Sequence, residues 1–212
     1  MSVICLIGDR SGAGKTTLAI NLAAALARKA PTVLLDADPH RAALQWCVKM
    51  QADQGLTVED AAWDLEKLCE RCYARHQHMV IDCPVSVRSS QTQAALSISD
   101  IALIPVRPVS VDLWATVNID YAVEDARQLN PKLNGLLVMN QLAPRQRISP
   151  LTQQSLNEID LPVTETRIRR RLAFNNSLKQ GQSVLQMGAQ GRAASAEIKQ
   201  LIDEVLPHEQ YR

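Results

Sequence analysis

The N-terminus constrains the fold most, because an apolar run is followed there by a glycine-rich loop and a helical pattern. Val3–Ile7 is continuously apolar, and the spacing of apolar residues predicts a helix over Lys15–Lys29. The loop between them reads Gly8-Asp9-Arg10-Ser11-Gly12-Ala13-Gly14-Lys15-Thr16-Thr17. A strand, a loop of this kind and a helix together are the setting of a phosphate-binding P-loop.

Each residue type in this loop suits phosphate binding. Gly12 and Gly14 allow the backbone to turn so that successive N–H groups face a bound anion. Lys15 can reach the β- and γ-phosphates, and Thr16 can ligate Mg²⁺. The usual first glycine is missing, because Asp9 occupies its position. We therefore expect the loop to bind a nucleoside triphosphate with Mg²⁺, through Ser11, Gly12, Ala13, Gly14, Lys15, Thr16 and Thr17.

The rest of the chain alternates between apolar runs and helical patterns. Further strands are predicted at Thr32–Leu35, Met79–Ile81, Ile101–Pro105 and Gly135–Met139. Further helices are predicted at Arg41–Gln51, Ala62–Arg75, Ser90–Ile98, Leu113–Leu129, Pro150–Asp160 and Ala193–Leu206. This alternation predicts an α/β fold, a mostly parallel sheet flanked by helices on both faces. With 212 residues, we expect a single domain over 1–212.

Three carboxylates follow predicted strands. Asp36 and Asp38 end the second strand in Leu35-Asp36-Ala37-Asp38-Pro39, and Asp82 ends another in Ile81-Asp82-Cys83-Pro84. Ligands of open α/β sheets bind at this carboxyl edge. Hydrolysis of a γ-phosphate needs one carboxylate near Mg²⁺ and another that orients water. A single acid of this kind can instead cap a helix, but three beside a P-loop favour a catalytic site.

Composition restricts the remaining possibilities. The net charge of +1 requires any nucleic-acid binding to come from a local patch, and 3% aromatic residues are too few for a base-stacking platform. No basic stretch precedes the first apolar run, which argues against a signal peptide. Five cysteines without an export signal are typical of reduced thiols, so we expect a cytoplasmic protein.

A basic segment lies at about 145–192, with a local excess of five positive charges. Its eight basic residues are Arg145, Arg147, Arg167, Arg169, Arg170, Arg171, Lys179 and Arg192, against three acids. Four of the arginines fall near a predicted strand-to-helix junction, where side chains of alternating direction cannot all be buried. The segment is either a phosphate-binding surface or a solvated run paired with local acids.

The order of these motifs resembles the ParA/MinD family of deviant P-loop ATPases, most closely the small ParA proteins without an N-terminal DNA-binding domain. The resemblance rests on Arg10–Thr17, Asp36–Pro39 and Ile81–Pro84, and extends through Ala43–Trp46, Ile104–Pro108, Asp112–Ala115 and Ser177–Val184. It covers nearly the whole chain and implies a P-loop NTPase of the SIMIBI type.

The resemblance also implies roles for individual residues. Lys15 would be the phosphate lysine, and Thr16 a magnesium ligand. Asp82 would hold the magnesium shell and Asp36 would support it. Asp38 would position the attacking water. Asn140 resembles the family's contact to the adenine edge. ATP and Mg²⁺ would be the cofactors, and turnover would be slow without a partner protein.

Members of this family form a homodimer that encloses ATP, and a signature lysine reaches the partner's nucleotide. Here the signature position is Arg10, followed by Ser11 in place of glycine. Arginine keeps the charge and adds a planar fork that can grip phosphate oxygens, but it is longer and more demanding in geometry. We expect dimerisation on ATP to persist, with Arg10 as a candidate catalytic residue acting across the interface.

In small ParA proteins the region of the basic segment contributes to sequence-independent DNA binding. The candidate DNA-binding residues are therefore Arg167, Arg169, Arg170, Arg171 and Lys179. The resemblance thus implies an ATPase that cycles on and off nucleoid DNA to position a plasmid, a chromosome or a protein assembly. A ParB-like or cargo-adaptor protein would stimulate hydrolysis.

Two other functions remain open. A MinD-like membrane switch needs a C-terminal amphipathic helix with a basic polar face. Residues 193–206 instead carry Glu197, Asp203 and Glu204 against Lys199, so we expect no membrane binding. A P-loop metabolic enzyme, such as an ATP-dependent synthetase, needs a second substrate pocket, and no nucleophile constellation is evident in the sequence.

Overall fold

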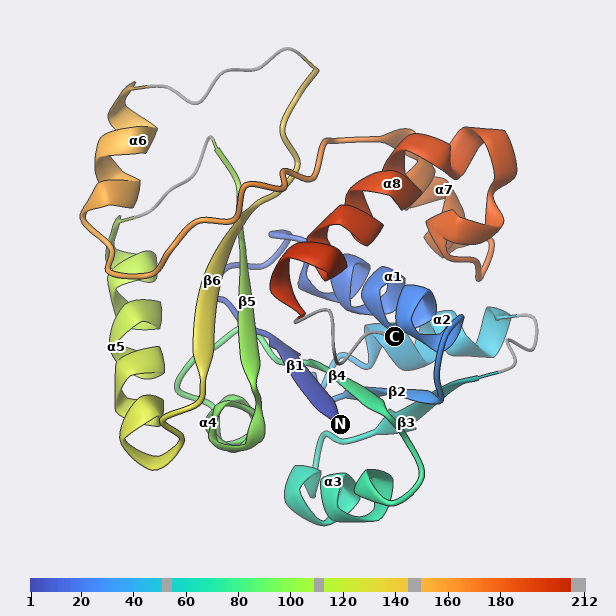
Figure 1. The fold of residues 1–212 in the computed structure, drawn as a ribbon, viewed down its shortest axis with the longest axis horizontal. Coiled ribbons are helices and arrows are strands. Elements are labelled where there is room, and N and C mark those ends of the chain that lie inside the picture. The colour runs from blue at the N-terminus through green and yellow to red at the C-terminus, as the bar shows by residue number, and fades with distance from the viewer. Residues whose placement is uncertain (51–54, 109–112, 145–149, 207–212) are drawn as a thin grey trace.

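Apolar strands form one parallel sheet in a computed structural model, which describes residues 1–50, 55–108, 113–144 and 150–206. The six strands run in the order β3-β2-β4-β1-β5-β6 (Figure 1). They are β1 (Ser2–Leu6), β2 (Thr32–Asp36), β3 (Leu56–Asp60), β4 (His78–Asp82), β5 (Ile101–Val106) and β6 (Asn134–Met139). All pairings are parallel, so every strand ends at the same edge of the sheet.

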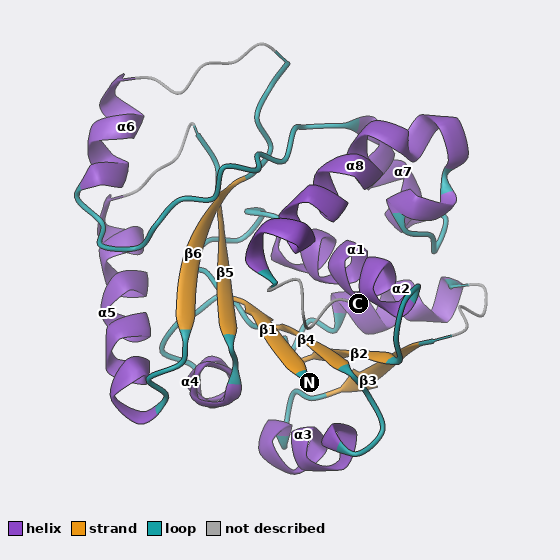
Figure 2. Ribbon diagram, in the orientation of Figure 1, coloured by secondary structure: helices purple, strands orange, loops and turns teal. Residues whose placement is uncertain are grey.

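Helices cover both faces of this sheet (Figure 2). One face packs against α3 (Leu65–Tyr73), α4 (Ser90–Ile98), α5 (Leu113–Leu129) and α6 (Pro150–Asn157). The other packs against α1 (Lys15–Ala27), α2 (Ala42–Lys49), α7 (Leu172–Lys179), the short helix η1 (Val184–Gln186) and α8 (Gly188–Val205). The sheet is therefore buried on both sides, and the predicted α/β architecture is confirmed.

Among the described residues, the sequence analysis missed the strand β3, the helix α7 and the short helix η1. β3 was not predicted because it is an edge strand: Leu56 is buried, while Thr57 to Asp60 are partly or fully exposed, so no continuous apolar run marks it. α7 is short and carries Asn175 and Asn176 in its middle, which weakens any helical pattern. Of the predicted strand-to-helix junction, the helix start is present, because Arg171 is the N-cap of α7, but among the described residues only an isolated bridge at Arg169 and no strand directly precedes it.

The C-terminal part of the chain returns along β6 before it enters α7. Isolated parallel bridges join Val163 to Leu137 and Arg169 to Leu142. Helix α8 then buries Ala194, Ile198 and Leu201 in the core beside α1. In the described part of the chain, no helix is both long enough and apolar enough to cross a membrane.

Some residues of the sequence motifs lie outside the described part. They are Asp112, Arg145 and Arg147, together with the side chains of Leu113, Trp114 and Ala115.

Candidate nucleotide-binding site

The loop after β1 forms an open anion cradle at the start of α1. Gly14 is the N-cap of α1 with φ of 99°, and no side chain caps the helix. Gly12 also has a positive φ of 73°. The first N–H groups of α1 therefore keep free hydrogen-bonding capacity at the positive end of the helix dipole. A Cβ at Gly14 would collide with the amide nitrogen of Asn140, so the position requires glycine on two counts.

Lys15 lies buried beneath this cradle. Its Nζ is 3.4 Å from the carbonyl oxygen of Gly8. Burial lowers the pKa of Lys15, and the nearby carboxylates of Asp82 and Asp38 oppose that effect. A buried ammonium group held among acids is positioned to bind the oxygens of a polyphosphate.

Asp82 is the strongest sign of a cation site. It is fully buried, and among the described residues neither carboxylate oxygen has a hydrogen-bond partner. Burial raises the pKa of Asp82 to about 7, although the nearby Thr16 hydroxyl and Lys15 ammonium lower it. An unsatisfied buried carboxylate is costly unless a cation or a proton joins it. The oxygen donors of Asp82 and Thr16 fit Mg²⁺, which prefers such ligands.

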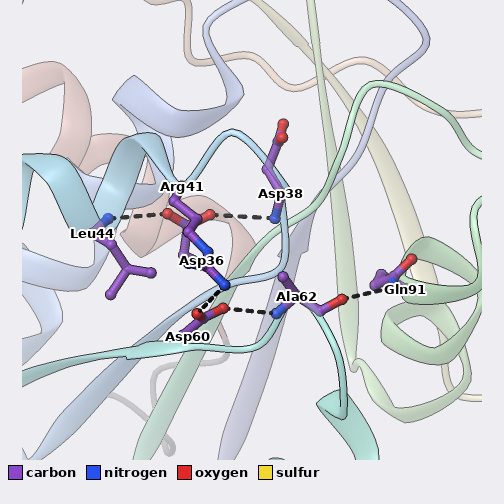
Figure 3. Close-up of polar contacts among 7 residues, drawn as sticks. All are labelled: Asp36, Asp38, Arg41, Leu44, Asp60, Ala62 and Gln91. Carbon is purple, nitrogen blue, oxygen red and sulfur yellow. Dashed lines mark hydrogen bonds and ion pairs between the residues drawn. The ribbon is translucent and has the colours of Figure 1, made fainter.

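Asp36 lies opposite Asp82 in the register of β2 and β4, but it already has partners. Its Oδ2 accepts the N–H of Leu44 at 3.0 Å and its Oδ1 accepts that of Asp38 at 3.3 Å (Figure 3). Burial raises its pKa, and these backbone N–H groups oppose the rise. Asp36 therefore anchors the start of α2 to the sheet, which is the capping role that the sequence left open.

Asp38 is held differently. Its Oδ1 accepts the N–H of His40 at 2.9 Å, and its carboxylate points away from Asp36 and Asp60 (Figure 3). The loop that carries it is fixed from the other side, where Arg41 Nη2 lies 2.8 Å from Asp60 Oδ2 at the end of β3. Asp38 thus has acceptor capacity left over, in a loop with a defined path.

Asn140 and Gln141 connect the end of β6 to the P-loop. Asn140 Nδ2 donates to the carbonyl oxygen of Ala13 at 2.7 Å, and Gln141 Nε2 donates to that of Gly12 at 2.8 Å. The sequence pointed to Asn140 but not to Gln141, whose φ of 57° turns its side chain back over the loop. Both residues fix P-loop carbonyls, which leaves the N–H groups free for an anion.

Asp9 is a second residue whose role the sequence did not reveal. Its Oδ1 accepts the N–H of Val87 at 2.9 Å, across the loop that follows β4. The P-loop is therefore tied to the segment between Asp82 and α4. Arg10 and Ser11 are exposed on the outer side of the P-loop, where a second molecule could approach them.

A cavity of about 410 Å³ adjoins the cradle on the side of β6 and α7. Gly14, Thr17 and Asn140 line it from the P-loop side, and Phe174 from α7. Its remaining wall contains Arg169, Arg170 and Arg171. A cavity next to a phosphate cradle has the place and size of a nucleoside pocket. Arginines expected to contact DNA thus lie beside the nucleotide site.

The structure distinguishes Arg171 from the other basic residues. Its Nε and Nη2 donate to Glu197 of α8, at distances of 2.6 to 3.2 Å. Glu197 raises the pKa of Arg171 through this contact. Arg167, Arg169, Arg170 and Lys179 are exposed. Of the two interpretations of the basic segment, pairing with an acid therefore holds for Arg171.

The fold and site define a class of protein. The family model "CobQ/CobB/MinD/ParA nucleotide binding domain" matches residues 4–185, so the chain belongs to this family of nucleotide-binding domains. The resemblance to ParA and MinD proteins is confirmed.

Individual relatives narrow the comparison. The chain is 36% identical over 202 residues to "Maintenance of carboxysome distribution protein A" of Halothiobacillus neapolitanus, with 93% of each chain covered. A structure of apo McdA from Cyanothece superposes with a TM-score of 0.75 at 15% identity, over 95% of this chain and 99% of that one.

A third comparison concerns the ligands. Cobyrinic acid a,c-diamide synthase from Mycobacterium smegmatis, with bound ATP analog and magnesium, superposes with a TM-score of 0.70 at 17% identity, over 84% of this chain and 93% of that one. At these identities the solved structures establish the fold. They also show that this fold holds ATP-like ligands and magnesium, in agreement with the expected cofactors.

Proposed function

We propose that the chain is a ParA-type ATPase that binds Mg²⁺ and ATP at the carboxyl ends of β1, β2, β4 and β6. The observation that carries this proposal is the buried carboxylate of Asp82, for whose oxygens the described residues provide no hydrogen-bond partner, beside the buried ammonium of Lys15. One group calls for a cation and the other for an anion, and a magnesium–triphosphate complex supplies both. Magnesium held by Asp82 and Thr16 would neutralise charge on the phosphate oxygens.

Asp38 is proposed to orient the water that attacks the γ-phosphate. Its backbone contacts hold the carboxylate at the carboxyl edge of β2, and it retains open acceptor positions. The pairing of Arg41 with Asp60 restricts the motion of this loop. Positioning of this kind, and not strong basicity, is what phosphoryl transfer to water requires.

ATP-dependent dimerisation is proposed to complete the site. Arg10 is exposed beside the cradle, where its guanidinium could reach phosphate oxygens of a second protomer's nucleotide. The dimer is proposed to bind duplex DNA without sequence preference through Arg167, Arg169, Arg170 and Lys179, with Arg171 held in part by Glu197. Nucleotide binding and DNA binding would then be linked, because Arg169 and Arg170 line the same cavity as Thr17.

We propose a carboxysome as the cargo, because the relative at 36% identity is named for carboxysome distribution and aligns over 93% of both chains. An adaptor protein on that cargo would stimulate hydrolysis and release the ATPase from the nucleoid. Membrane binding by α8 is disfavoured, since its apolar residues pack into the core and its Glu204 accepts the N–H groups of Glu165 and Thr166.

Size-exclusion chromatography with light scattering tests the proposal. The parent and Asp38→Ala are each run with Mg²⁺ and ATP, with ADP, and with added duplex DNA. We expect an ATP-stabilised dimer that Asp38→Ala traps and that stays bound to duplex. Monomers at saturating nucleotide, with duplex bound equally well in its absence, would refute the proposal.

A further inference from the structure

Helix α2 connects the Asp38 loop to a turn that lies far along the sequence. Its first residues are fixed to the catalytic edge, because Leu44 donates its N–H to Asp36 and Arg41 donates its N–H to the carbonyl oxygen of Asp38. Its last turn packs on the Gly181–Gln182 turn, which joins α7 to η1. An eight-residue helix is a short rigid connection, about 12 Å long.

Two contacts join α2 to this turn. The indole Nε1 of Trp46 donates to the carbonyl oxygen of Gln182 at 3.2 Å. Gly181 has φ of 64° and lies so close to Lys49 that a Cβ there would collide with the Lys49 carbonyl. Trp46 itself is buried, so the polar end of its ring has been placed against a specific acceptor. The contact is directional and tightly packed.

The same turn ends α7, and α7 begins directly after the arginines of residues 167–171. Its N-cap is Arg171, and Phe174 and Asn175 line the cavity beside the P-loop. Near the C-terminal end of α7, Leu178 shares a second cavity, of about 290 Å³, with Trp46 of α2 and Thr16 of the P-loop helix. Space is therefore present beside the contact, and a small movement of α2 need not be blocked by close packing.

The far side of the turn is fixed to α1. The N–H of Val184 donates to Asn21 Oδ1 at 2.8 Å, and Asn21 is completely buried. Asn21 in turn donates to the carbonyl oxygen of Thr17, one turn earlier in the P-loop helix. The turn is thus held between a helix that follows the P-loop and a helix that follows the Asp38 loop.

We infer that the contact between α2 and the Gly181–Gln182 turn transmits the state of the Asp38 loop to α7 and to the exposed basic residues at its two ends. Trp46 and Gly181 are then positioning residues for nucleotide-dependent DNA binding. The inference rests on the proposed function, because it explains how occupancy at the γ-phosphate would change the placement of Arg169, Arg170 and Lys179. Coupling between two sites is reciprocal. The factor by which the triphosphate raises the affinity for DNA should therefore equal the factor by which DNA raises the affinity for the triphosphate.

Gly181→Ala tests the contact, and Gly188→Ala is a matched control. Both glycines have a similar positive φ, 64° and 56°, so each substitution carries comparable backbone strain. Only the Cβ at 181 meets Lys49, whereas nothing lies within 4 Å of a Cβ at 188. The difference between the two variants therefore isolates the contact with α2.

The measurement is the ratio of dissociation constants for a random-sequence duplex with Mg-ADP and with the slowly hydrolysed analogue Mg-ATPγS. We expect a ratio of about tenfold or more for the parent and Gly188→Ala, and a ratio within about twofold of one for Gly181→Ala. The affinity of Gly181→Ala for ATPγS without DNA should change less than about threefold. The gain in ATPγS affinity on adding DNA should fall in parallel.

Trp46→Phe provides a second route if Gly181→Ala does not fold, as judged by circular dichroism. It keeps an aromatic ring in the core but removes the N–H donor to Gln182 together with part of the indole, so the ratio should fall by at least about threefold. If folded Gly181→Ala keeps the parental ratio of dissociation constants, the inference is overturned and the proposed function is left intact. If Gly181→Ala does not fold, a parental ratio in Trp46→Phe has the same meaning. A parental ratio of one would overturn the proposed function, and this inference with it.

Discussion

The carboxyl edge of the sheet, which holds Lys15 and Asp82, and the basic segment at 145–192 both depend on charged side chains, yet they are built in opposite ways. At the edge, Lys15 and Asp82 are buried, and the described residues provide no hydrogen-bond partner for the carboxylate oxygens of Asp82. In the basic segment, Arg169 and Arg170 are exposed, and Arg171 is neutralised by Glu197. Burial without satisfaction makes the first site demand a ligand. In the basic segment the exposed charges are solvated by water, so that surface is stable without a ligand.

This difference predicts how each region responds to change. When its ligand or partner is removed, a buried ionised group bears its full desolvation cost without compensation, so substitutions at the edge should act strongly and locally. Exposed charges interact weakly one by one and depend on salt, so the basic segment should respond gradually and in proportion to the number of charges. The predictions below rank these responses.

The largest effect is expected from Lys15→Ala. Removing the buried ammonium should weaken binding of Mg-ATP by about a hundredfold or more, because a charge-assisted contact in a desolvated site is lost. Isothermal titration calorimetry measures it. Lys132→Ala, an exposed lysine in the loop before β6, should leave the affinity unchanged. Equal affinities for the two variants would show that the edge is no more demanding than the surface.

The next effect concerns DNA. Reversing Arg169 and Arg170 together to glutamate should weaken duplex binding by about thirtyfold at low salt, roughly 2 kcal/mol. If about four phosphates are contacted in the parent, the salt slope should drop from about −3.6 to about −1.8. Fluorescence anisotropy across a salt series gives both values.

Arg71→Glu with Arg75→Glu is the matched control, because both are exposed arginines at the α3 side of the molecule. It makes the same change in net charge away from the basic segment, and we expect only a small loss. Similar losses in the two double variants would mean that net charge, and not the basic segment, determines DNA binding.

A smaller effect is expected from pH. Because burial raises the pKa of Asp82 to about 7, its carboxyl is mostly ionised near pH 8 and mostly protonated near pH 6. Mg²⁺ must displace that proton, so each pH unit below 7 should weaken magnesium-dependent binding by about tenfold. Titrations of the same nucleotide in EDTA account for protonation of its own phosphates. A magnesium-dependent increment that is flat with pH would remove Asp82 from the cation site.

The smallest effect is expected from Glu197→Gln. It replaces the bidentate partner of Arg171, a carboxylate whose side chain is only 11% exposed, and should lower the free energy of unfolding by about 1 kcal/mol. Urea denaturation measures it. Glu124→Gln removes the pair with Arg127, in which the glutamate side chain is 68% exposed, and should cost less than about 0.5 kcal/mol. Equal costs would place Arg171 among ordinary surface pairs.

The sequence predicted what depends on local order and on the rule that parallel strands end at one edge. Lys15, Asp38 and Asp82 belong to short motifs after buried strands, so the fold brings them together without knowledge of distant contacts. β3 escaped detection because an edge strand lacks a continuous apolar run. Gln141, Asp9 and Glu197 escaped because their roles depend on partners far along the chain, Gly12, Val87 and Arg171.

The basic segment shows the same limit. A charge excess indicates a surface that attracts anions, but it does not reveal which arginine is paired. Only the position of α8 shows that Arg171 is held while Arg169 and Arg170 are exposed. Likewise, the packing of Gly181 on Lys49 depends on the meeting of two helices that are far apart in sequence.

Asp9 has a consequence for engineering this scaffold. Where a standard P-loop begins with glycine, this one begins with a side chain that holds the backbone of Val87. Transplanting a consensus loop from a relative would sever that tether, although every residue known for gripping phosphate would be retained. Loop swaps on this chain must therefore exchange the stretch around Val87 at the same time, as one inherited unit.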